Sequence, residues 1–137
     1  MILIINTAPK DYFEIILAPK KTEYKSLIVR GSFNQAEKLL PAIDKLLKKQ
    51  KIKKEQLRGI GIVVGPGGFT AIRIGVAVAN VFGYALNLPL IEIKVGEFTD
   101  PASLVELVYG KIKTTPKAKL VMPVYDREPN ITLSKKK

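Results

Sequence analysis

The apolar positions of the chain form short dense runs near its start and longer spaced patterns further on. Dense runs bounded by turn residues are typical of strands. The first three runs are separated by short polar turns and predict an antiparallel meander, whereas the later two alternate with helical patterns. The predicted strands cover residues 2–5, 12–17, 24–29, 59–64 and 90–94.

Apolar residues three or four positions apart predict three helices. The first is capped by Ser32 and extends to about residue 47. Because Pro41 falls inside its pattern, it is expected to kink or to begin properly only near that proline. The second covers about residues 69–87. The third covers about residues 101–111, with Asp100 as its N-cap and a proline in its first turn.

This order of elements indicates an α/β fold, with a mixed sheet and helices packed on it. A short helical turn is expected at residues 52–57. After Lys113 the chain is basic and contains proline, so it is expected to be extended. The length of 137 residues and an apolar fraction of 47% fit one domain with a real core.

The chain contains neither cysteine nor histidine. This nearly excludes a zinc or iron site and any catalysis by an imidazole, and leaves only an oxygen-ligand site for Mg²⁺ or Ca²⁺. The carboxylates show no paired spacing, and no serine lies in a nucleophile elbow. We therefore predict no catalytic residue and no metal site. A reducing cytoplasm fits the missing cysteines.

No targeting or membrane segment is predicted. The amino-terminal apolar run lacks a preceding basic region and reads as a strand, not a signal peptide. The longest apolar stretch, residues 74–86, is shorter than a membrane span and contains Asn80 and Gly83. The chain is expected to be soluble.

The net charge is +11, and the excess lysine gathers in residues 45–54, 111–119 and 135–137. Such a balance favours an anionic partner such as RNA. Solvated surface is the alternative, and the two remain open at this point. No aromatic residues interleave with the lysines, so the sequence does not indicate a base-stacking platform.

A glycine-rich loop follows the fourth predicted strand. It lacks the lysine of a P-loop, and Thr70 stands where the dinucleotide pattern needs a third glycine. Backbone amides around Gly65, Gly67 and Gly68 are still able to bind an anion at the helix start, with Thr70 as the cap and Arg73 within reach. The alternative is a tight turn without a ligand.

The second predicted helix is apolar nearly all round, so it must be covered on more than one side. Small residues recur every four positions along it, at Ala71, Gly75, Ala79 and Gly83. This strip permits a close approach, either by the domain's own elements or by another protein. We favour a partner protein, because exposed apolar patches mark interfaces.

The stretch GIGIVVGPGGFTAIRIGVAVANVFGYALNLPLIEI, residues 59–93, closely resembles the signature of the bacterial TsaB (YeaZ) family. That signature has a GPGSFTGLRIG-like loop, a long apolar helix and an N-x-P-L strand. Residues 2–8, 39–47 and 122–132 resemble other family segments in the same order. The resemblance implies a single actin/Hsp70-like (ribonuclease H-like) lobe with a mixed five-stranded sheet and flanking helices.

The family is regarded as a set of non-catalytic paralogues of TsaD. They act with TsaD and the ATPase TsaE to install threonylcarbamoyladenosine next to the anticodon of tRNAs that read ANN codons. The resemblance therefore implies a scaffold subunit that forms a helix bundle with TsaD, or a homodimer through the same helices when alone, with tRNA contacted indirectly or weakly. The interface residues expected on this basis are Leu39, Ile43, Leu46, Ala71, Ile72, Gly75, Val76, Ala79 and Gly83.

The alternative is a small ATP-binding enzyme of the same fold that uses residues 65–73. For the scaffold no intrinsic cofactor is expected, and ATP or ADP is expected only within the complex. Asn6 stands where the fold's phosphate-handling aspartate usually lies, which weakens any Mg²⁺–nucleotide site. Further departures from the family pattern are Gln35, Gly68 and Ala71, where His, Ser and Gly are usual.

The largest departure is length, because the family normally carries a second lobe. Residues 97–120 leave room for little more than one helix. We therefore predict a TsaB-like amino-terminal lobe over residues 1–112 and a basic extended tail over residues 113–137.

Overall fold

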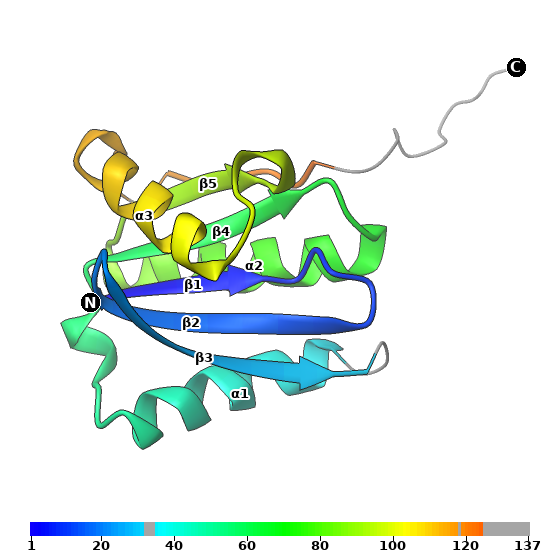
Figure 1. Cartoon of the computed structure of the whole chain (residues 1–137), viewed down its shortest axis with the longest axis horizontal. Helices are drawn as coiled ribbons and strands as arrows, with labels where there is room; N and C mark the ends of the chain where they lie inside the picture. The colour runs from blue at the N-terminus through cyan, green and yellow to red at the C-terminus, as the bar shows by residue number, and fades with distance from the viewer. Residues whose placement is uncertain (32–34, 118, 125–137) are drawn as a thin grey trace, which may run out of the picture.

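A computed structural model describes residues 1–31, 35–117 and 119–124 of the chain. Five strands form one mixed sheet in the order β3-β2-β1-β4-β5 (Figure 1). β1, β2 and β3 are antiparallel neighbours, whereas β4 runs parallel to both β1 and β5. The strands are β1 Ile2–Asn6, β2 Tyr12–Lys20, β3 Glu23–Arg30, β4 Gly59–Gly65 and β5 Leu90–Lys94.

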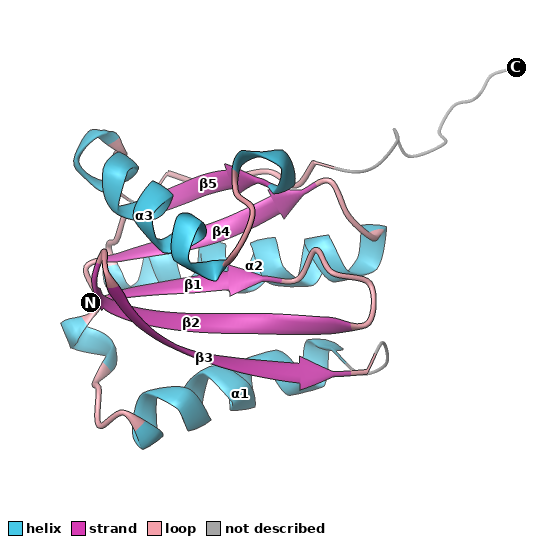
Figure 2. Ribbon diagram, viewed as in Figure 1, coloured by secondary structure: helices cyan, strands magenta, loops and turns pink. Residues whose placement is uncertain are grey.

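Helices cover both faces of the sheet (Figure 2). α1 Gln35–Lys49 and α2 Phe69–Leu86 pack on one face, and α3 Pro101–Lys111 packs on the other. Figure 1 shows α2 behind the sheet and α3 in front of it. β1 and β4 are buried along their whole length because they lie in the middle of the sheet between these layers.

The predicted strands and helices are confirmed. The helix expected at residues 101–111 begins at Pro101, and Asp100 caps it by accepting a hydrogen bond from the Ser103 amide at 2.8 Å. The turn expected at residues 52–57 is a short 3₁₀ helix, Lys54–Gln56. Two further 3₁₀ helices, Val95–Glu97 and Ile112–Thr114, had no clear sequence signal.

The first helix did not start late at its proline. α1 already includes Gln35, and Pro41 lies inside it at an exposed position. An exposed proline leaves the buried side of the helix free to pack, with Leu39 and Ile43 fully covered. Ser32, the expected cap, lies outside the described residues.

After α3 the chain returns along α2 and β4 as an extended segment, residues 119–124. The Asn80 side chain of α2 binds the Val121 backbone twice, accepting from its amide at 2.9 Å and donating to its carbonyl at 3.1 Å. The Val124 amide then donates to the Val64 carbonyl at 2.6 Å. The described part of this segment therefore packs on the lobe, while the domain boundary at residue 112 remains a prediction.

α2 is long and apolar enough, by length and composition alone, to cross a membrane. Core helices of soluble proteins pass the same test. Here one side of α2 packs on the sheet through Ile72, Val76 and Ala79, as in a core helix.

Candidate functional site

The side of α2 that faces the sheet carries the small residues. Gly75 lies against Thr7, so closely that even a methyl group there would collide with the threonine side chain. A methyl group at Gly83 would lie 2.6 Å from Leu90 of β5. Small residues therefore allow α2 to approach its own sheet closely.

This arrangement differs from the expected interface. Eight of the nine residues expected to contact a partner are buried within the lobe. Ala71 alone is half-buried. The sequence of a helix that is apolar nearly all round does not reveal which side faces the sheet. In α2 the close approach of Gly75 and Gly83 to the sheet decides which side this is. The residues that the structure places in the core are Leu39, Ile43, Leu46, Ile72, Gly75, Val76, Ala79 and Gly83.

The opposite side of α2 is apolar and exposed. Val81 is 66% exposed and Tyr84 78% exposed, and Ala77 and Ala85 on the same side are also exposed. We call these four residues the outer face of α2. Large apolar side chains in such a position usually mark an interface.

Apolar side chains are also exposed near the beginnings of the two helices. Phe69, the first residue of α2, is 45% exposed, and Leu40 of α1 is 50% exposed. Ala36 of α1 and Ile74 of α2 line one shared hollow, so the two helix starts adjoin. The interface expected from the sequence lies on the same two helices but does not include these exposed residues. Their only signal in the sequence is that they are the apolar residues left over once Gly75 and Gly83 face the sheet.

The glycine loop between β4 and α2 is shaped by its neighbours. Gly65 has a φ of +120°, and a side chain there would strike the Val124 backbone. A methyl group at Gly67 would lie 3.1 Å from the Ala8 backbone. Gly68 is the N-cap of α2 and has open space around it. Two of the three glycines are thus explained by close packing of the chain on itself.

Thr70 does not cap α2, because the helix already begins at Phe69. The Arg73 guanidinium lies 5.2 Å from the centre of the Phe69 ring, a cation–π distance. A hollow of about 510 Å³ opens beside this loop, where the beginnings of α1 and α2 meet Lys10, and Glu37 also lines it. Backbone amides at a helix start and one lysine are able to hold an anion, while Glu37 opposes one.

The end of β1 lies beside the loop. The Asn6 side chain accepts a hydrogen bond from the Ala8 amide at 3.1 Å, so it serves the turn. The Thr7 hydroxyl is fully buried and has no hydrogen-bond partner among the described residues. Across the sheet Asn6 pairs with Glu14, whose burial raises the pKa of its carboxyl group. In the described part of the chain no three His, Cys, Asp or Glu side chains gather in a way that would hold a metal ion.

The sheet order, the helices on its two faces and the glycine loop define one lobe of the actin/Hsp70-like fold. A family model described as TsaD, tRNA N6-adenosine threonylcarbamoyltransferase, matches residues 31–99, half of the chain. The chain belongs to this family.

Within the family, the chain is a TsaB-like protein. It is 33% identical over 93 residues to the tRNA threonylcarbamoyladenosine biosynthesis protein TsaB of Buchnera aphidicola subsp. Schizaphis graminum, covering 68% of this chain and 43% of that protein. A tRNA N6-adenosine threonylcarbamoyltransferase of Legionella pneumophila (strain Lens) is 44% identical over 55 residues, which are 40% of this chain and 16% of that one.

The solved structure of YeaZ from Pseudomonas aeruginosa has the same fold. It superposes with a TM-score of 0.63 and 24% identity, over 68% of this chain and 43% of the other. The chain therefore spans less than half the length of the TsaB relative, and a still smaller part of the transferase.

Proposed function

We propose that this chain is a non-catalytic scaffold subunit of a tRNA threonylcarbamoyladenosine-modifying complex in the cytoplasm, and that it binds a TsaD-type subunit. The outer face of α2 carries this proposal. It is the largest run of exposed apolar side chains on α2, and it lies within the segment that matches the family model. The two most exposed apolar side chains in it are Val81 and Tyr84.

The surface suits a helix-to-helix contact. Ala77, Val81 and Tyr84 follow one another at spacings of four and three residues, so they form a single stripe along α2. Alanine at the beginning of the stripe permits a partner helix to approach, and the valine and tyrosine that follow supply apolar area. Aromatic residues are enriched at the centres of such interfaces.

A pull-down with purified TsaD tests the proposal. The double variant Val81→Glu/Tyr84→Glu places two charges on the stripe and is expected to weaken binding at least ~10-fold, because a charge buried without a partner is costly. The matched control is Ala102→Glu/Thr99→Glu, which adds the same charges at exposed positions beside α3 on the other face of the sheet. TsaD binding unchanged in the first variant would place the interface elsewhere.

The same face is proposed to form a homodimer when TsaD is absent, since an apolar stripe of this kind can cover itself in a two-fold arrangement. Sedimentation of the isolated chain tests this. A dimer that the double variant converts to a monomer supports one shared surface, and a wild-type monomer at high concentration would contradict it. Contacts with TsaE, and ATP or ADP held only within the complex, belong to the same proposal.

ATP binding by the isolated chain is the second candidate function. The hollow beside Lys10 at the two helix starts favours it, while Glu37 in its wall and Asn6 at the end of β1 oppose it. Calorimetry with ATP and Mg²⁺ decides between ATP binding and the scaffold role alone. Micromolar binding that Lys10→Ala abolishes would support a nucleotide site, and no heat of binding would leave the scaffold as the sole candidate.

A further inference from the structure

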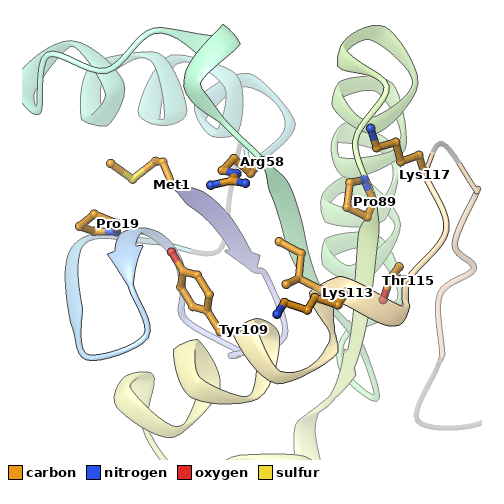
Figure 3. Close-up of a pocket in the computed structure, with 9 residues that line it drawn as sticks. Met1, Pro19, Arg58, Pro89, Tyr109, Lys113, Thr115 and Lys117 are labelled. Atoms are coloured by element: carbon orange, nitrogen blue, oxygen red, sulfur yellow. The ribbon is translucent and has the colours of Figure 1, made fainter.

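A cleft of about 480 Å³ lies at the end of the sheet opposite the glycine loop (Figure 3). It opens where β1, β4 and β5 begin, since Met1, Arg58 and Pro89 directly precede these strands. Pro19 of β2 and Tyr109 of α3 line the same cleft. Its size falls in the range of roughly 300–1,000 Å³ that is usual for ligand clefts.

The charged side chains of this cleft are all cationic. Arg58, Lys113 and Lys117 line it, and no acidic residue does. All three are exposed, and among the described residues none of them makes an ion pair. The two neutral hydroxyl groups are already engaged, because Tyr109 donates to the Ala18 carbonyl at 2.6 Å and Thr115 to the Lys111 carbonyl at 2.8 Å. The side-chain donors left for a ligand are therefore those of the three cations.

The influence of Arg58 extends across the cleft. Burial raises the pKa of the Tyr109 hydroxyl, and the positive charge of Arg58 acts against this by stabilising the phenolate. Because Arg58 lines the cleft and no acidic residue does, the cleft is electropositive. Such a cleft concentrates anions from solution.

More lysines surround the cleft at the same end of the molecule. Lys20 ends β2 next to Pro19 and Lys21 follows it in the turn to β3, while Lys53 and Lys54 precede Arg58. The acids Glu23 and Glu55 also lie at this end, and the cations outnumber them. The fold thus joins lysines from separate stretches of the sequence into one basic surface.

An aromatic side chain adjoins the basic surface. A second hollow shares Met1 and Pro19 with the cleft and is also lined by Tyr24, which is 37% exposed. Gln50, Lys25 and the acidic Glu23 line the same hollow. An exposed ring next to cations that make no ion pair among the described residues fits a nucleic acid, whose bases stack while its phosphates bind lysine and arginine.

We propose that RNA binds across this end of the sheet, with its phosphates in the cleft at Arg58, Lys113 and Lys117. The proposal deepens the proposed function, and it rests on that function for the identification of the RNA as tRNA. Charge complementarity favours this ligand, because an RNA backbone offers regularly spaced phosphates to a surface that carries several cations. The TsaD-binding face of α2 is a separate surface, so the two proposals can fail independently.

Fluorescence anisotropy with a labelled tRNA transcript and the full chain tests the proposal. The triple variant Arg58→Ala/Lys113→Ala/Lys117→Ala is expected to bind at least ~10-fold more weakly near 100 mM salt. The slope of log affinity against log salt is expected to fall by about 2, because each phosphate contact contributes roughly 0.7–0.9 to it. Tyr24→Ala is expected to weaken binding of a short single-stranded RNA several-fold.

The control variant Lys38→Ala/Lys94→Ala removes two exposed cations from elsewhere on the lobe. It is expected to change the affinity by less than about 2-fold, which separates a local site from net charge. An unchanged salt slope in the triple variant overturns the proposal, and so does an equal loss in the control. Tighter binding to vesicles that contain phosphatidylserine, or equal binding to heparin, would assign the cleft to another polyanion.

TsaD pull-down with the triple variant keeps the two proposals apart. We expect TsaD to remain bound when RNA is lost, and RNA to remain bound to Val81→Glu/Tyr84→Glu. Loss of TsaD from the triple variant would show that this end of the sheet is a protein interface and would overturn its assignment to RNA. Circular dichroism confirms that each variant is folded.

Discussion

Both sides of α2 carry apolar side chains, but these side chains differ in what they contact. Towards the sheet, Gly75 and Gly83 let the helix lie almost on Thr7 and Leu90. Away from the sheet, Val81 and Tyr84 project large apolar groups into solvent. The two glycines permit an internal contact, whereas Val81 and Tyr84 have no such contact in the lobe. Apolar character alone therefore does not distinguish the core side of a helix from its binding side.

The largest expected effect comes from enlarging the sheet side. Gly75→Arg puts a long charged side chain where Thr7 already fills the space, and we expect it to destabilise the fold by ~3 kcal/mol or more. Urea unfolding followed by circular dichroism measures this. The control Ala77→Arg, two residues further along, places the same side chain on the exposed side and should cost less than ~0.5 kcal/mol. Equal losses would contradict the assigned orientation of α2.

The next effect concerns the boundary between the two sides, where Asn80 binds the segment that returns after α3. Asn80→Ala removes both hydrogen bonds to Val121 and leaves backbone groups of a buried residue without partners. We expect a loss of about 1–3 kcal/mol and faster proteolytic cleavage near residue 121. Thr70→Ala on the same helix is the control. Unaltered cleavage in Asn80→Ala would show that Asn80 does not retain the segment.

A smaller effect is expected in the sheet itself. There the contrast is between two neighbouring buried residues of β2, the apolar Phe13 and the ionisable Glu14. Burial raises the pKa of Glu14, so the folded state holds its proton more tightly than the unfolded state. The stability contributed by Glu14 is therefore present below the unfolded pKa and is lost as pH rises through the folded value.

Glu14→Gln removes this dependence. Relative to wild type, the variant should gain stability as pH rises from 4 to 7, and the difference between the two unfolding free energies measures the gain. Glu106→Gln, at an exposed position of α3, controls for the loss of one negative charge. A difference that stays flat across this range would contradict the assigned effect of burial.

The smallest effect on stability is expected on the outer face. Val81→Ser/Tyr84→Ser should change the free energy of unfolding by less than ~0.5 kcal/mol, because neither side chain is packed in the folded lobe. Chemical denaturation of the isolated chain at low concentration checks this, since a dimer would otherwise contribute. A loss above ~1 kcal/mol would mean that the stripe is part of the core.

Much of the fold follows from local sequence patterns. Dense apolar runs predicted all five strands, and Asp100 with Pro101 marked the beginning of α3 correctly. These signals are local, since a strand or a helix cap depends on few neighbouring residues. Pro41 misled the estimate of where α1 begins, because its exposure on the finished helix depends on how α1 packs.

The site was less predictable because its residues become neighbours only on folding. Sequence similarity suggested the proposal that α1 and α2 form the interface. Which side of α2 is exposed, however, depends on the contacts that Gly75 and Gly83 make with residues distant in the sequence. Likewise, lysines and tyrosines that do not interleave in the sequence meet at one end of the sheet, where Arg58, Tyr109 and Lys113 line one cleft. Periodicity carries no information about such long-range neighbours.

The hydrogen bonds that Asn80 and Val64 make with the returning segment also bear on the order of synthesis. A ribosome completes β4 and α2 well before Val121 and Val124 emerge, and in that interval the partners of the Asn80 amide and the Val64 carbonyl are still missing. The nascent lobe thus exposes a strip beside Gly65 that the later segment covers. Final closure of the lobe is therefore delayed until that segment is translated.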